Sequence, residues 1–236
     1  MEWFIMKKIK NKYAICFFPV IGIVAGALLY GWNYVCTACG FGQICFAMVG
    51  AVIPVIITGG IHIEGFMNTT DALRSGEKKE RKQEILKNPH VGAFAVAAAI
   101  CFFMLYVAGL MLIWKENQLL LLGLGYIISR TLSGMGLVWF PMAGKEGTLY
   151  SFSSMADRRT VRVVLVMLLA LELAGAVIIQ PLIGAVMSLA AMWVWTYYYY
   201  MSKGRFGGIT GDVAGYFTCL CELSGVLVIG FMGRVM

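Results

Sequence analysis

Long runs of apolar residues, separated by short polar stretches, dominate the chain. A helix must be about 20 residues long to cross a hydrocarbon core of roughly 30 Å, and seven runs are close to that length or longer. The runs predict transmembrane helices near residues 14–35, 41–58, 91–114, 118–140, 163–180, 181–201 and 213–233. The pattern therefore predicts an all-α, polytopic membrane bundle of about seven helices, which forms one domain over residues 1–236.

The composition agrees with a membrane protein and excludes a soluble globule. Hydrophobic residues make up 60% of the 236 residues and charged residues 13%, whereas a soluble domain carries about 25% charged residues. The net charge is +7, but the basic residues stand beside the apolar runs, where they set orientation. We therefore expect the lipid bilayer as a partner and no nucleic acid.

Basic residues gather on one side of the predicted bundle. Nearly all of the 19 lysine and arginine residues fall in the N-terminal segment or in three connections, at residues 59–90, 141–162 and 202–212. Connections rich in lysine and arginine stay in the cytoplasm, so the pattern predicts a cell-membrane protein with a cytoplasmic N-terminus. The other connections are short and nearly uncharged. We expect the active site at the cytoplasmic face, where the three polar connections converge.

The first connection carries an acidic block at residues 59–72. Ionisable groups at a membrane boundary are costly and often mark functional sites. If the segment is helical, Glu64, Asn68 and Asp71 follow at i, i+4 and i+7 and line one face. Two carboxylates and an amide oxygen suit a hard divalent cation. The alternative is an interfacial cap with incidental acids, but the neighbouring glycines, which allow close approach of a ligand, favour a functional site.

A second block, at residues 207–215, is rich in glycine and leads into the last predicted helix. Its backbone N–H groups can face an anion, and Asp212 can complement the helix dipole or hold a metal; the alternative is a helix N-cap. Glu222 lies deeper in this helix, where a carboxylate needs a partner. Arg130 is the candidate, either in a structural ion pair or as a substrate contact. For Glu172 we expect at most an interhelical hydrogen bond.

Between the acidic block and the third predicted span, residues 77–87 predict a short amphipathic helix with Ser75 as its cap. We interpret its first three lysines as a solvated basic face that only sets topology. These lysines are Lys78, Lys79 and Lys82. Arg74 and Lys87 stand closer to the acidic block and are better candidates for binding phosphate.

These blocks, in this order and on this hydropathy profile, resemble the cobalamin synthase family of adenosylcobinamide-GDP ribazoletransferases. The family hallmark is a glycine pair followed by His-x-Asp-Gly-x-x-Asp-x-x-Asp, which corresponds to residues 59–71. The other similar segments are residues 84–92, Ser129-Arg130, Lys145-Glu146-Gly147 and residues 207–222. Three positions depart from the family pattern, because Glu64, Asn68 and Asn88 stand where the family has aspartate.

The resemblance implies a reaction and a set of roles. The ribose hydroxyl of α-ribazole, or of its 5′-phosphate, attacks adenosylcobinamide-GDP, and GMP leaves with the help of Mg²⁺. The implied catalytic residues are His62, Asp71 and Asp212. The implied Mg²⁺ ligands are Glu64, Asn68, Asp71 and Asp212. The implied contacts to substrate and phosphate are Arg74, Lys87, Arg130, Lys145, Gly208, Thr210 and Gly211.

Two rival functions remain open on the sequence. One is a corrinoid-binding or transport subunit, which would place its ionisable groups near the bilayer midplane; only Arg130, Glu172 and Glu222 fit that description. The other is an integral-membrane CDP-alcohol phosphotransferase, whose Asp-x-x-Asp-Gly-x-x-Ala-Arg pattern the chain lacks. Further partners that we expect are other enzymes of corrinoid synthesis and a second copy of the chain.

Overall fold

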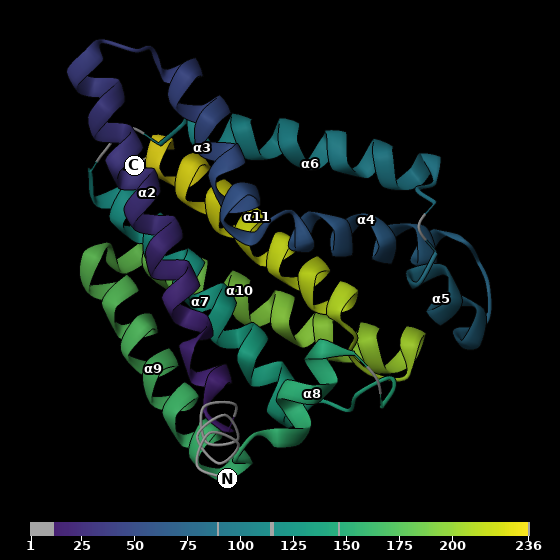
Figure 1. Ribbon diagram of the computed structural model, residues 1–236. Helices are drawn as coiled ribbons and strands as arrows, with labels where there is room; N and C mark the ends of the chain where they lie inside the picture. Colours follow the sequence, from purple (N-terminus) through teal and green to yellow (C-terminus); the bar gives the residue numbers. More distant parts are fainter. Residues whose placement is uncertain (1–11, 89, 114–115, 146, 236) are drawn as a thin grey trace, which may run out of the picture.

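The computed structural model describes residues 12–88, 90–113, 116–145 and 147–235, and this part of the chain is built of helices (Figure 1). The predicted all-α fold is confirmed. In chain order the elements are η1 (Ala14–Phe17), α2 (Phe18–Cys39), α3 (Gln43–Thr58), α4 (Ile61–Arg74), α5 (Lys79–Leu86), α6 (Ala93–Met111), α7 (Glu116–Trp139), α8 (Thr148–Met155), α9 (Arg158–Ile179), α10 (Pro181–Met201), the π-helical turn η2 (Ser202–Phe206) and α11 (Gly211–Val235).

Six helical segments of the described chain are long and apolar enough to cross a membrane, and up to seven if α3 and α4 count together. The six match the first predicted span and the last five, so the polytopic bundle is confirmed. The matching segments are Ala14–Cys39, Ala93–Met111, Asn117–Trp139, Arg158–Ile179, Pro181–Phe206 and Gly211–Val235.

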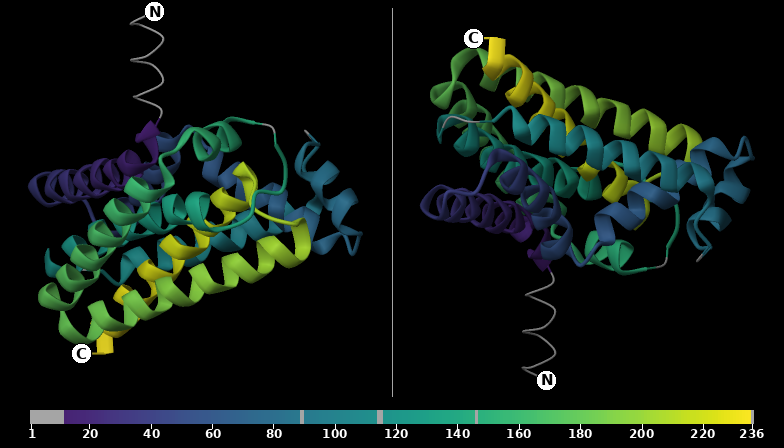
Figure 2. Two further views of the ribbon diagram at one scale, coloured as in Figure 1. Left: turned by 90° about the horizontal axis from the view of Figure 1, so that it is seen from below. Right: turned by 90° about the horizontal axis from the view of Figure 1, so that it is seen from above.

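The second predicted span differs from the expectation. Its residues form α3, which has only 16 residues and is shorter than the roughly 20 needed to cross the hydrocarbon core. Gly59 and Gly60 then adopt left-handed backbone angles (φ 62° and 83°), which glycine reaches without a steric penalty. The chain turns there by 92° and continues as α4. The acidic block, predicted within a polar connection, is therefore a helix that lies alongside α6 and α11, with α5 at its far end (Figures 1 and 2).

Helices α7 and α11 form the centre of the bundle. In their most apolar stretches 78% and 67% of the residues are buried, against 22% for α9. Small residues permit this close packing: a Cβ on Gly22 of α2 would lie 2.6 Å from the carbonyl oxygen of Tyr126 in α7. The two helices that carry Arg130 and Glu222 are thus the most shielded from lipid.

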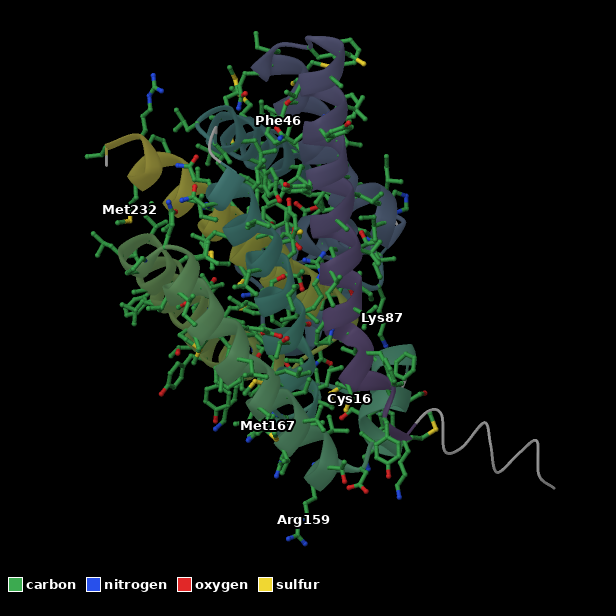
Figure 3. All side chains as sticks on the ribbon, turned by 90° about the vertical axis from the view of Figure 1, so that its left-hand side faces the viewer. Cys16, Phe46, Lys87, Arg159, Met167 and Met232 are labelled. Atoms are coloured by element: carbon green, nitrogen blue, oxygen red, sulfur yellow. The ribbon has the colours of Figure 1, made fainter. Side chains whose placement is uncertain are left out.

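The outer helices present apolar side chains to the surroundings. Met167 on α9, for example, is 62% exposed, as expected for a helix whose neighbours are lipid tails. Figure 3 places Cys16 and Arg159 near one end of the bundle and Phe46 near the other. The exposed Arg159 marks the end that also carries the basic residues around α8.

Candidate active site

The acidic block and the glycine-rich block meet where α4 packs on the first turns of α11. A Cβ on Gly65 would lie 2.6 Å from the carbonyl oxygen of Asp212, and a Cβ on Gly215 would lie 3.1 Å from the Cα of His62. The two glycines therefore let the helix backbones touch. This contact brings Asn68 close enough to donate a hydrogen bond from Nδ2 to Oδ1 of Asp212, over 3.0 Å.

Asp71 holds the start of α6. Its two carboxylate oxygens accept hydrogen bonds from the backbone N–H groups of Gly92 (2.6 Å) and Ala95 (2.9 Å). Gly92 must lack a side chain here, because a Cβ would lie 2.7 Å from both oxygens of Asp71. Asp71 thus satisfies two N–H groups at a helix start that have no partner within the helix. A metal-binding role for Asp71 stays a prediction, alongside this structural one.

Glu64 completes the polar face of α4, and its side chain is exposed. The described residues contain no group of three or more His, Cys, Asp or Glu side chains arranged to hold a metal ion. Mg²⁺ does not need such a group, because it usually keeps several waters and binds one or two carboxylates together with substrate phosphates. This smaller set of ligands can come from Asp212, from the carbonyl oxygen of the Asn68 amide and from Glu64, which lies one helical turn from Asn68.

His62 points to a different side of α4. Residues two positions apart stand roughly 200° around a helix, so His62 does not share the face of Glu64. It lines a small pocket between α3, α4, α6 and α11, together with Thr58, Tyr106 and Glu222. The row formed by Glu64, Asn68 and Asp71 and the side chain of His62 thus lie on opposite sides of α4.

Arg130 forms the buried ion pair with Glu222 that was one of the two alternatives from the sequence. Its Nη1 also donates to Ser129 Oγ over 2.9 Å, and the side chain is buried. Beside the pair, the hydroxyl groups of Tyr106 and Tyr126 lie 2.8 Å apart. The sequence did not indicate this tyrosine pair, because nothing in an apolar run singles out one tyrosine.

Glu172 makes the interhelical hydrogen bond that was expected of it. Its carboxylate accepts from the hydroxyl of Thr131 over 2.7 Å. The contact joins α9 to α7, the helix that also carries Arg130. The prediction for Glu172 is therefore confirmed.

The glycine-rich block forms a tight loop before α11. Gly208 faces the carbonyl oxygen of Pro141, which would lie 2.4 Å from a Cβ. Thr210 caps α11, because its hydroxyl accepts the backbone N–H of Val213 over 3.2 Å; the cap is therefore not Asp212. Gly211 begins the helix and is exposed, and a Cβ on this residue would meet no atom within 4 Å.

The polar loop between α7 and α8 is hydrogen-bonded to this glycine-rich loop. Ile209 donates its N–H to the carbonyl of Pro141 (2.8 Å) and accepts the N–H of Ala143 (3.0 Å). The link is a single parallel bridge between Met142 and Ile209. Lys145 follows three residues after the bridge and is exposed. The predicted convergence of polar loops is thus seen for these two.

Helix α5 docks on the same loop. It spans Lys79–Leu86 and is preceded by Lys78 as N-cap, not by Ser75. Ser75 lies at the end of α4, where its hydroxyl donates to the carbonyl of Ala72. Gln83 donates from Nε2 to the carbonyl oxygen of Phe206 over 2.6 Å, which fixes α5 against η2.

The remaining candidates lie at the rim. Arg74 ends α4 and Lys87 follows α5, and both side chains are exposed; Lys87 is labelled in Figure 3. The structure therefore brings Asn68, Asp212 and the glycine loop together. It leaves Arg130 inside the bundle.

Fold and site together define a polytopic helical membrane protein whose polar site is assembled from two distant, glycine-flanked acidic segments. A family model described as cobalamin-5-phosphate synthase matches residues 5–230. The chain belongs to this family.

Curated relatives agree with this assignment. The chain is 36% identical, over 97% of its length and 86% of the relative's, to an adenosylcobinamide-GDP ribazoletransferase of Lachnoclostridium phytofermentans. It is 31% identical to a protein of the same name from Clostridium perfringens, strain SM101, over 94% of the chain and 88% of the relative. For the one from Chlorobium phaeovibrioides the identity is 28%, over 89% and 84%. No solved structure matches the chain.

Proposed function

We propose that this chain is an adenosylcobinamide-GDP ribazoletransferase that completes cobalamin synthesis at the membrane. The observation that carries the proposal is the hydrogen bond between Asn68 and Asp212. It joins the first and last blocks of the family pattern, which lie 144 residues apart, in one site. Family membership over almost the whole chain supports the same activity.

The reaction replaces a phosphoanhydride bond with a phosphate ester. The ribose hydroxyl of α-ribazole, or of its 5′-phosphate, attacks the corrinoid-linked phosphorus of adenosylcobinamide-GDP. A new P–O bond forms, the P–O bond to GMP breaks, and the hydroxyl proton is given up to a base or to solvent. The products are adenosylcobalamin, or its 5′-phosphate, and GMP. Such transfers depend mostly on positioning and charge neutralisation, which suits a site of acidic, amide and basic groups.

The residues divide these tasks. His62 is the proposed acceptor of the hydroxyl proton. Because it lies on the other side of α4 from Glu64, the hydroxyl would have to reach it through the pocket between α4, α6 and α11. Asp212, Asn68 and Glu64 would hold Mg²⁺, which when bound would neutralise phosphate charge. Lys145 and the glycine loop bind phosphate oxygens.

The rival transport function loses its main support. Of its three ionisable residues, Arg130 and Glu222 pair with each other, and Glu172 accepts from Thr131. These contacts tie helices together and do not need a transported ion.

We further propose that the protein lies in the cell membrane with its N-terminus and the site at the cytoplasmic side. The placement of lysine and arginine supports this orientation. It also matches substrates that are phosphorylated and too polar to cross a bilayer. An association with other corrinoid enzymes, or with a second copy, remains a prediction.

The test is GMP release by purified protein in lipid nanodiscs, given adenosylcobinamide-GDP and α-ribazole, with and without Mg²⁺. Release that requires both the acceptor and Mg²⁺ is the expected result. Asp212→Asn should reduce the rate by at least about tenfold, whereas Asp157→Asn should not change it, because Asp157 caps α9 away from the site. No release from folded wild-type protein would refute the proposed activity.

A further inference from the structure

One side of α5 faces inward. Of the three lysines interpreted as a solvated basic face, Lys78 and Lys79 are exposed as expected, but Lys82 is buried. Residues 79, 82, 83 and 86 follow the i, i+3, i+4 and i+7 spacing and share this side. Leu86 is buried here, and Gln83 donates to the carbonyl oxygen of Phe206. The side that carries Lys79 and Lys82 is therefore the side that docks on η2 and the end of α4.

Lys79 is exposed, and its side chain passes over the glycine loop. A Cβ on Gly207 would stand 2.9 Å from Cε and 3.2 Å from Nζ of Lys79. Gly207 also has a left-handed backbone (φ 83°), so no other residue would fit easily beneath this side chain. The ammonium group is held at the loop that leads through Thr210 into α11.

Lys82, one turn along, is only 4% exposed. Its aliphatic stem is buried, but its ammonium nitrogen is not one of the fully buried polar atoms that lack a partner, so the charge reaches the surface beside the docked side of α5. A lysine whose stem is fixed by packing and whose ammonium group stays accessible is placed to meet a negative charge brought by a ligand.

The acidic residues of α5 do not supply that charge. Glu80 and Glu84 lie away from the docked side of the helix and are exposed, and Glu84 pairs with Arg81 there. The outer side of α5 thus carries two glutamates and one arginine, whereas the charged residues of the docked side are both lysines.

We infer that Lys79 and Lys82 form a phosphate-binding edge over the Gly207–Gly211 loop and that their ligand is the diphosphate of a nucleoside diphosphate ester. Within the proposed function, on which this assignment rests, that ester is the GDP portion of adenosylcobinamide-GDP. Helix α5 then orients the departing GMP. Ammonium groups suit this task, because charge-assisted hydrogen bonds to phosphate are short and strong.

The experiment measures GDP binding to the full-length protein in neutral phosphatidylcholine nanodiscs by calorimetry. Lys79→Gln and Lys82→Met are the test variants, and Lys78→Gln is the matched control, because Lys78 is adjacent in sequence and its side chain makes no capping bond. Loss of one charged hydrogen bond should weaken GDP binding by about tenfold in each test variant and leave the control unchanged. The KM for adenosylcobinamide-GDP should rise by a similar factor, with a smaller effect on kcat.

Thermal stability separates ligand binding from a structural role. Lys82→Met removes the charge and keeps most of the buried stem of the side chain, so the melting temperature should stay about the same while GDP affinity falls. A lower melting temperature together with unchanged GDP affinity in Lys79→Gln would overturn the inference.

Two further results show whether the phosphate comes from GDP or from a lipid headgroup. If wild-type protein binds no GDP in neutral lipid, and phosphatidylglycerol stabilises wild type but neither variant, the edge holds a lipid headgroup and the inference is wrong. If GDP binding depends on both lysines but no acceptor-dependent GMP release occurs, the phosphate edge stands and the proposed transferase activity fails.

Discussion

The substitution Asn68→Asp restores the aspartate of the family pattern. It should lower the stability of the protein in the absence of Mg²⁺ and lower the Mg²⁺ concentration that activity requires. The amide nitrogen of Asn68 lies 3.0 Å from Oδ1 of Asp212, and the substitution puts a carboxylate oxygen in its place. Two unit charges at that distance repel by about 5.5 kcal/mol at an effective dielectric constant of about 20, and by about 1.4 kcal/mol in bulk water. Both side chains are partly buried and can rotate apart, so we expect a loss of about 2 kcal/mol.

The assay is unfolding of the purified protein by a denaturing detergent, with EDTA and with Mg²⁺. In EDTA the variant should unfold earlier than wild type. Saturating Mg²⁺ should remove the difference, because a divalent cation between two carboxylates converts their repulsion into binding, and the Mg²⁺ concentration for half-maximal GMP release should fall by about tenfold.

Asn88→Asp is the control. It adds the same charge at another position where the family has aspartate, but Asn88 is exposed and its amide oxygen accepts from His90. It should change the stability in EDTA by no more than about 0.5 kcal/mol. If Asn68→Asp behaves like this control in both EDTA and Mg²⁺, Asn68 and Asp212 do not share a metal site.

Three further changes test the packing around the site. Gly92→Ala should destabilise the protein by about 2 kcal/mol or more, because the added Cβ would meet the carboxylate of Asp71. Gly211→Ala is the matched control, because the space around Gly211 is open. Equal melting temperatures for the two variants would contradict the close approach of Gly92 to Asp71. Asp71→Ala should cost about 1–2 kcal/mol through loss of the α6 cap, measured by detergent unfolding, and no loss would show that Asp71 serves the metal alone. Arg130→Met should cost about 3–5 kcal/mol by leaving Glu222 buried and unpaired, and adding Glu222→Leu should recover most of it; a double variant as unstable as the single one would argue against a structural pair.

The sequence predicted what depends on local spacing. The apolar runs indicated the helices, since length and hydropathy alone decide whether a segment can cross lipid. The i, i+4, i+7 spacing correctly placed Glu64 and Asn68 on one face of a helix. The sequence also offered the Arg130–Glu222 pair as an alternative, because each charge lies in an apolar run and needs a partner, and few other charged residues lie in such runs.

What the sequence could not supply are contacts between distant segments. Asp71 resembles a metal ligand in sequence, and only the position of α6 reveals that it accepts two backbone N–H groups. The second apolar run predicted a span, but Gly59 and Gly60 turn the chain before the run is long enough. Lys82 looked solvated because its own helix is highly charged, although its spacing from Leu86 already marked one side of α5.

The partnership of Asn68 with Asp212 also has a consequence for biosynthesis. The two residues are separated by 144 positions, and ribosomes add about 5–20 residues per second, so the α4 half of the site waits in the membrane for roughly 7–30 s before α11 is even synthesised. During that interval Asn68 and the exposed backbone at Gly65 lack the helix they are built to contact. A nascent chain should rely on the insertion machinery to shield α4 until its last helix arrives, and truncation within α11 should leave a chain that is inserted but inactive.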